Sequence, residues 1–90
     1  NSLQMWELDT RTAVRNFVGH TDIISSLKLH ADKTSLLSTS WDGTIRLWDV
    51  ATGLTIRKFT GHRGAVHCAI FSNDGKYIYS AGADRNINIW

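Results

Sequence analysis

Identical residues recur at a fixed spacing of 42 positions along this chain of 90 residues. Trp6, Trp48 and Trp90 follow this spacing, and the dipeptide Gly19-His20 returns as Gly61-His62. When residues 7–48 are aligned with residues 49–90, ten positions are identical and most others exchange similar side chains. A period of this length is typical of repeat architectures, in which one supersecondary unit is copied and stacked. The sequence therefore predicts two copies of one unit.

Each unit is predicted to consist of short β-strands. Apolar residues recur at a period of two, and the segments are rich in Ile, Val, Thr, Tyr, Phe and Trp, which suit a pleated sheet. Turn residues such as Asp42-Gly43 and Asn73-Asp74-Gly75 separate the segments. The predicted strands lie at 2–6, 12–17, 24–29, 35–40, 44–48, 54–59, 66–71, 77–82 and 86–90.

One break in the alternation occurs in both units. Ile24 and Leu27 are separated by an odd number of residues, and the same pattern returns 42 positions later. An odd step between side chains on one face requires an additional residue in the strand. We therefore expect β-bulges near Ser25-Ser26 and near His67-Cys68.

Composition argues against several classes of protein. The net charge of +2 arises from ten Lys or Arg and eight Asp or Glu that are scattered singly, so no basic run indicates nucleic acid or a membrane surface. No apolar run is long enough for a membrane span or a signal peptide. The single cysteine, Cys68, cannot form an internal disulfide, which favours an intracellular protein, either cytoplasmic or nuclear. We expect no cofactor.

A four-stranded meander with apolar side chains on both faces needs a similar sheet on each side, and radial stacking of such sheets gives a β-propeller. The Gly-His near the start of each unit and the Trp48-Asp49 pair near its end resemble the WD40 repeat. The resemblance covers the whole chain, although Glu7 replaces the Asp that would follow Trp6. It implies an all-β chain of four-stranded antiparallel blades in an incomplete propeller. The implied division is a partial blade at 1–17, a complete blade at 18–59, and a second blade at 60–90 that lacks its last strand.

The WD40 resemblance also implies a set of hydrogen-bonded side chains that braces each unit. In that family a His, a Ser or Thr, a turn Asp and the Trp form a tetrad. The matching residues in the first unit are His20, Ser40, Asp42 and Trp48. In the second unit Gly82 stands at the hydroxyl position, so we expect an incomplete tetrad and a weaker blade. The remaining matches there are His62, Asp84 and Trp90.

Two other chemistries involve the same residues. His20, Asp42 and Ser40 could form a hydrolase triad, but the trio recurs at the blade spacing without its hydroxyl and no oxyanion-hole motif accompanies it. His62, His67 and Cys68 could suggest a metal site, but their spacing matches no zinc signature. The structural interpretation is favoured. We expect no catalytic residue and no metal, and we expect Cys68 to be a small core residue.

Residues that differ between the units are the candidates for recognition. Trp41 precedes the turn at Asp42, at the end of the blade where His20 must approach, and large aromatics are enriched among interface hot spots. Packing against a neighbouring blade is the alternative. The resemblance implies that partners bind residues just after Gly-His and just before the turn Asp, and two arginines lie in the same loops. The candidates are Ile23, Ser25, Trp41, Ala65, His67, Ala83, Arg63 and Arg85.

The WD40 resemblance implies a non-catalytic scaffold for protein–protein interaction within a multiprotein complex, which binds proteins or peptides through this loop face. The alternative is a subunit of a ribonucleoprotein or RNA-processing assembly that contacts RNA through Arg63, Arg85 and Trp41. We expect no membrane partner. Nine strands are not a multiple of four, so we expect the chain to be an excerpt of a longer propeller. We also expect the isolated chain to self-associate through its open blade faces.

Overall fold

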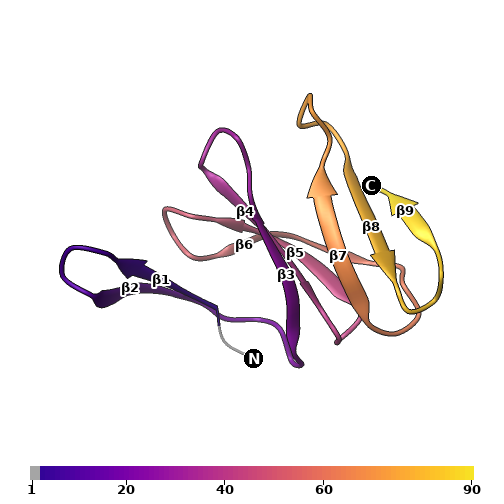
Figure 1. Ribbon diagram of the computed structural model, residues 1–90, viewed down its shortest axis with the longest axis horizontal. Helices are drawn as coiled ribbons and strands as arrows, with labels where there is room; N and C mark the ends of the chain where they lie inside the picture. The colour runs from indigo at the N-terminus through magenta and orange to yellow at the C-terminus, as the bar shows by residue number, and fades with distance from the viewer. Residues whose placement is uncertain (1–2) are drawn as a thin grey trace.

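The computed structural model describes residues 3–90, which form nine strands and contain no helix (Figure 1). Accordingly, none of the described residues belongs to a helix that could cross a membrane. The strands are β1 Leu3–Glu7, β2 Thr12–Phe17, β3 Ile24–Leu29, β4 Ser35–Ser40, β5 Thr44–Asp49, β6 Thr55–Thr60, β7 Val66–Phe71, β8 Ile78–Gly82 and β9 Ile87–Ile89. Most bounds equal the predicted ones or shift by one residue. Residues 1 and 2, which open the predicted partial blade and first strand, lie outside the described residues.

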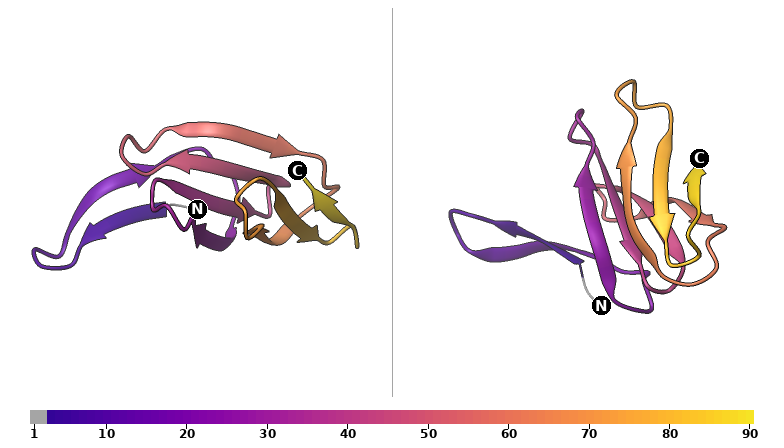
Figure 2. Two further views of the ribbon diagram at one scale, coloured as in Figure 1. Left: turned by 90° about the horizontal axis from the view of Figure 1, so that it is seen from above. Right: turned by 45° about the vertical axis from the view of Figure 1, so that its right-hand side comes forward.

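The strands form three antiparallel sheets. The first sheet contains β1 and β2, the middle sheet contains β3 to β6 in order, and the third sheet contains β7 to β9. Figure 2 shows the middle and third sheets packed face to face, with the β1–β2 hairpin extending on the other side of the middle sheet. The predicted all-β class, with antiparallel blades in an incomplete propeller, is confirmed.

Alternation along β4 and β5 divides the side chains of the middle sheet between two cores. Leu37 and Ile45 face the third sheet, where they are fully buried against its inner face. Leu36 and Trp48, which are cross-strand partners, face the first sheet instead. Because successive strand residues point to opposite faces, both sides of the middle sheet are apolar and both need cover. The buried partners are Val66, Ala69 and Ile78 on the third sheet, and Leu3 and Phe17 on the first.

The two predicted bulges are confirmed. The pairing of β3 with β4 shifts between Ile24 and Ser26, and the pairing of β7 with β8 shifts between Val66 and Cys68. Both shifts place one additional residue in the first strand of a sheet, β3 or β7, which changes the face to which the following side chains point. The structure adds two bulges that the sequence did not indicate, at Met5/Trp6 and at Leu47/Trp48.

The expectation that Cys68 is a core residue is wrong, because its side chain is exposed. Beyond the bulge, Ala69 points into the core between the sheets and is 1 % exposed. Its neighbour Cys68 must therefore point to the other face of the third sheet. No other sheet covers that face among residues 3–90.

Candidate functional site

A chain of hydrogen bonds braces the middle sheet from its edge to its core. The Trp48 indole N–H donates to Oγ of Ser38 at 2.7 Å, and Nε2 of His20 lies 2.6 Å from the same hydroxyl. Nδ1 of His20 lies 3.0 Å from Oδ2 of Asp42, in the turn between β4 and β5. An ionised carboxylate only accepts, so Nδ1 carries the proton and Nε2 accepts from the Ser38 hydroxyl. The Trp48 indole N–H, the Ser38 hydroxyl and both ring nitrogens of His20 each therefore have a hydrogen-bond partner within this brace.

The hydroxyl in this chain belongs to Ser38, and the expectation that Ser40 supplies it is wrong. Trp48 pairs with Leu36 across the strands, so its indole reaches Ser38, two residues along the same face. Ser40 lies two residues further along β4, about 7 Å beyond Ser38. Its Oγ instead accepts the N–H of Asp42 at 3.1 Å. The sequence contained a signal for the correct position, because Ser38 and Ser80 are identical at the 42-residue spacing whereas Ser40 aligns with Gly82.

The second unit contains the same arrangement, so the expectation of an incomplete tetrad is also wrong. Ser80 accepts the Trp90 indole N–H at 2.8 Å and lies 2.6 Å from Nε2 of His62. Nδ1 of His62 lies 3.0 Å from Oδ1 of Asp84. Gly82 has a separate reason to be glycine, since a Cβ there would stand 2.7 Å from the carbonyl oxygen of Ala65. Its lack of a hydroxyl therefore removes nothing from the brace.

The environment keeps the imidazole of the first brace neutral and its carboxylate charged. Burial lowers the pKa of His20 below 6.5, against the opposing hydrogen bond and charge of Asp42. Burial raises the pKa of Asp42, but hydrogen bonds from the Thr44 hydroxyl, the Thr21 N–H and His20 outweigh it and hold that pKa well below its usual range. The second carboxylate has fewer donors. Chiefly through the hydrogen bond from His62, the pKa of Asp84 falls to about 2.

A Ser-His-Asp sequence of contacts exists in each unit, but it has the properties of a brace. Ser38 is completely buried, and its oxygen already accepts the indole N–H of Trp48. A nucleophile needs a free lone pair and an open approach for the substrate. The same arrangement at Ser80, 2 % exposed, is equally closed. Among residues 3–90, no three side chains of His, Cys, Asp or Glu lie close enough together to hold a metal ion.

Both glycines of the repeated Gly-His pairs make room for a large side chain, Arg46 of β5 in the first unit and Trp90, which follows β9, in the second. A Cβ on Gly19 would lie 2.7 Å from the guanidinium of Arg46, which donates to the Gly19 carbonyl oxygen at 3.1 Å and to Oγ1 of Thr55 at 3.1 Å. A Cβ on Gly61 would lie 2.5 Å from the ring of Trp90. Sequence reasoning missed Arg46, because the second unit has Asn88 at the matching position.

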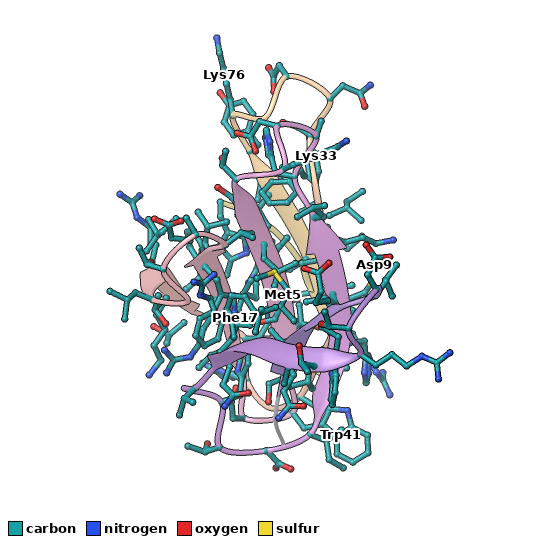
Figure 3. All side chains as sticks on the ribbon, turned by 90° about the vertical axis from the view of Figure 1, so that its left-hand side faces the viewer. Met5, Asp9, Phe17, Lys33, Trp41 and Lys76 are labelled. Atoms are coloured by element: carbon teal, nitrogen blue, oxygen red, sulfur yellow. The ribbon has the colours of Figure 1, made fainter. Side chains whose placement is uncertain are left out.

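Six of the eight candidate recognition residues lie on loops that meet at one end of the sheets, and Ser25 and His67 lie at the bulges of β3 and β7. The Trp41 N–H donates to the carbonyl oxygen of Ile23 at 2.8 Å, and Ala83 makes the same bond to Ala65 in the second unit. Trp41 is 49 % exposed and Ile23 is 47 % exposed. Figure 3 shows Trp41 projecting from this end, opposite the turns that carry Lys33 and Lys76. We name the surface formed by Ile23, Trp41 and the loop 62–64 the loop rim.

The two units contribute jointly to the loop rim. A Cβ on Gly43, in the turn that follows Trp41, would lie 3.2 Å from the carbonyl oxygen of Gly64. The loop that carries Arg63 therefore lies directly beside the turn that follows Trp41. Arg63 and Arg85 are exposed, as are His67 and Ala83, whereas Ala65 is half-buried.

One candidate, Ser25, forms a hydrogen bond between the middle sheet and the third sheet. Its hydroxyl donates to the carbonyl oxygen of Val66 in the next unit and lies 2.7 Å from Oγ1 of Thr39, which in turn lies 2.7 Å from Oγ of Ser26. The hydroxyl is thus engaged in joining β3 to β7. These bonds are absent from the second unit, where His67, Cys68 and Ala81 occupy the matching positions.

Comparison with known proteins agrees with this geometry. The family model "WD domain, G-beta repeat" matches residues 11–49 and 53–90. Periodic tryptophan protein 2 homolog of Schizosaccharomyces pombe is 31 % identical over 86 residues, which are 96 % of this chain and 10 % of that protein. Periodic tryptophan protein 2 of Arabidopsis thaliana is 41 % identical over 46 residues, 51 % of this chain and 5 % of that protein. The chain thus spans a tenth or less of each relative.

Each matched segment begins near an outermost strand, β2 or β6, and continues through three strands of the following sheet. The sequence repeat therefore bridges two sheets. Together with the two complete braces and the Gly-His and Trp residues that build them, these matches show that the chain belongs to the WD40 repeat family.

Proposed function

We propose that this chain is part of a non-catalytic scaffold for protein–protein interaction, and that it binds a protein or peptide at the loop rim. The observation that supports the proposal is the pair Ile23 and Trp41, which are joined by a backbone hydrogen bond and whose large apolar side chains are about half exposed. Exposed aromatic residues on loops of a rigid scaffold are favoured anchors for a partner. The braces beneath them reduce the entropy lost when a partner binds.

Charge at the loop rim favours a protein partner over RNA. The loops contain the exposed residues Arg63 and Arg85, and they also contain the exposed carboxylate of Asp22. The carboxylates of Asp42 and Asp84 lie close by in the braces, where their side chains are 8 % and 6 % exposed. Binding to single-stranded RNA relies on an excess of positive charge along the backbone together with stacking platforms. A mixed surface around an apolar pair is typical of the rim of a protein interface.

Burial of both brace hydroxyls supports the non-catalytic part of the proposal, because neither Ser38 nor Ser80 is open to a substrate. The part of the chain that the structure describes also provides no cluster of metal ligands, and the proposed function requires no cofactor. The single cysteine, exposed and without a disulfide, supports an intracellular location in the cytoplasm or the nucleus.

Quantitative affinity capture from an extract of the source cells tests this function. The compared baits are the wild-type chain, Trp41→Ala, and Tyr77→Ala as a matched control, because Tyr77 is 50 % exposed and follows the β7–β8 turn at the other end of the sheets. We expect a set of proteins that Trp41→Ala loses and Tyr77→Ala retains, and that withstands nuclease and moderate salt. Equal capture by all three baits would exclude the loop rim as the binding site. Loss after nuclease treatment, with a steep salt dependence, would indicate RNA.

A further inference from the structure

The outer edge of the middle sheet presents backbone groups that no neighbouring strand uses. β6 lies along the outer side of this sheet (Figure 2, left), and within residues 3–90 it pairs only with β5. Alternate N–H and C=O groups of Thr55–Thr60 therefore point away from the sheet. A propeller blade is a four-stranded sheet, and β3 to β6 already complete one. The edge of β6 is thus not a place that the repeat itself fills.

A pair of like charges distinguishes β5 and β6 from the outer strands of the first sheet. Arg46 and Lys58 are cross-strand partners, so their side chains lie on the same face of the middle sheet. At the same place in the first sheet the partners are Gln4 and Asn16, which are both neutral. Like charges directly opposite each other destabilise a sheet. The repeat does not require this pair, so the two charges need another explanation.

No carboxylate compensates the charge of Arg46 and Lys58. In the part of the chain that the structure describes, every ion pair joins a histidine to an aspartate. Arg46 donates to uncharged oxygens of Gly19 and Thr55, and its Nε is buried without a partner. Burial lowers the pKa of His20, and the positive charges of Arg46 and Lys58 add to that shift. This face of β6 therefore carries an unneutralised positive charge.

Arg57, the neighbour of Lys58, does not belong to this surface. Its counterpart Arg15 donates to the carbonyl oxygen of Val50, so an arginine at this repeat position has a structural use. Lys58 points to the opposite face of β6, where it is exposed, and its counterpart Asn16 is exposed as well. Lys58 is therefore the cation at this edge that a partner can reach.

We propose that an extended acidic segment of a partner protein adds to the outer edge of β6 as a further strand, with a carboxylate side chain opposite Lys58. In strand addition the backbone hydrogen bonds supply affinity and the side chains supply specificity. The carboxylate follows Arg46 and Lys58 in one cross-strand row, so its negative charge offsets their repulsion. The same charge disfavours a second copy of β6, which is equally basic.

The edge of β6 suits a polypeptide better than RNA. Single-stranded RNA is bound with the help of aromatic side chains on which its bases stack. The aromatic residue of β6, Phe59, packs against the core instead. A sheet edge offers donors and acceptors at the spacing of another strand, which an extended peptide matches.

Exchange of charge between the chain and a peptide tests this site. The probe is a fluorescein-labelled peptide of about eight residues in which glutamate alternates with valine, and the matched peptide has lysine in place of glutamate. By fluorescence anisotropy, we expect the wild-type chain to bind the glutamate peptide. Lys58→Glu should weaken that binding by about fivefold or more and should bind the lysine peptide in preference. Lys58→Gln, which only removes the charge, should give a smaller loss.

Lys76→Glu is the matched control, because Lys76 is exposed in the β7–β8 turn, away from β6 (Figure 3). It should bind the glutamate peptide like the wild-type chain, and circular dichroism should show the same strand content in all variants. Trp41→Ala should also bind this peptide normally, since the loop rim is a separate surface. Failure of the loop rim as a binding site would therefore leave this result unchanged, and the reverse also holds.

Hydrogen exchange distinguishes strand addition from attraction between charges alone. Bound glutamate peptide should slow the exchange of the outward-pointing amides of Thr55–Thr60, which only water contacts in the free chain. A peptide with one central valine replaced by proline keeps its charge and should bind at least about tenfold more weakly. The proposal is overturned if the glutamate peptide does not bind, if Lys58→Glu keeps the wild-type preference, or if the β6 amides gain no protection. Displacement of the peptide by oligouridylate at a lower concentration than by unlabelled peptide would assign the edge to RNA and also overturn it.

Discussion

Trp48 and His20 meet at a single atom, Oγ of Ser38, although they come from β5 and from the segment before β3. The hydroxyl accepts the indole N–H and donates to the imidazole, so one small side chain joins the core strand to the loop rim. Ser80 performs the same function between Trp90 and His62. The connection between the core strand and the loops therefore depends on a serine that lies outside the Gly-His and Trp-Asp pairs.

Ser38→Ala should destabilise the fold strongly for so small a change. It leaves the Trp48 indole N–H and Nε2 of His20 buried without a partner, at a cost of about 2–3 kcal/mol. Chemical denaturation at a fixed protein concentration measures this loss. Ser40→Ala is the matched control and should cost about 1 kcal/mol, since Ser40 accepts only the Asp42 N–H in the turn. Equal losses of stability at the two positions would show that Ser38 does not connect Trp48 to His20 in the brace.

Truncation of Trp48 should destabilise the fold far more than truncation of Trp41. Trp48→Ala removes a side chain that is 1 % exposed between two sheets, and it should cost about 3–5 kcal/mol or prevent folding. Trp41→Ala removes one that is 49 % exposed, and it should change stability by less than about 1 kcal/mol. Thermal melts at equal protein concentration compare the variants. A large loss for Trp41→Ala would mean that Trp41 packs against the fold and is not available to a partner.

His20 should make the fold weaker in mild acid. Burial lowers its pKa in the folded chain below the reference of 6.5, so the unfolded chain binds the proton first as the pH falls. The stabilisation is fully present above pH 6.5 and is lost progressively as the pH falls through the folded pKa. NMR titration of the His20 ring, with urea midpoints at several pH values, measures both quantities. A ring that titrates above 6.5 would contradict the burial argument.

Gly82→Ser makes the second unit identical to the first at this position, and it should nevertheless weaken the fold. The added Cβ would lie 2.7 Å from the Ala65 carbonyl oxygen, which the Ala83 N–H holds in place at 2.8 Å. Relief requires a backbone shift that costs about 1–3 kcal/mol. Urea denaturation gives the change, and Ala83→Ser, exposed on the adjacent residue, serves as the control. Stabilisation by Gly82→Ser would restore the interpretation that Gly82 lacks a needed hydroxyl.

Local chemistry made much of this fold predictable. Alternation with period two located the strands, and the odd step from Ile24 to Leu27 located the bulge at Ser25, because both patterns depend only on which face each side chain occupies. The brace was predicted less well. Ser38 and Ser40 lie on the same face of β4, so alternation cannot distinguish them, and the register of Trp48 opposite Leu36 decided between them.

By itself, the sequence determined the repeat, the strand class and the residues Trp48, His20 and Asp42, because a 42-residue period places equivalent side chains at equivalent points of every sheet. Only the tertiary structure decided which residues a neighbouring sheet buries or binds by hydrogen bonds. Ser25 is engaged by the Val66 carbonyl oxygen, Cys68 is exposed, and Tyr79 is uncovered where Leu37 is buried. Burial and hydrogen bonding between sheets depend on what lies opposite a residue, and the residue's own position in the repeat does not specify that.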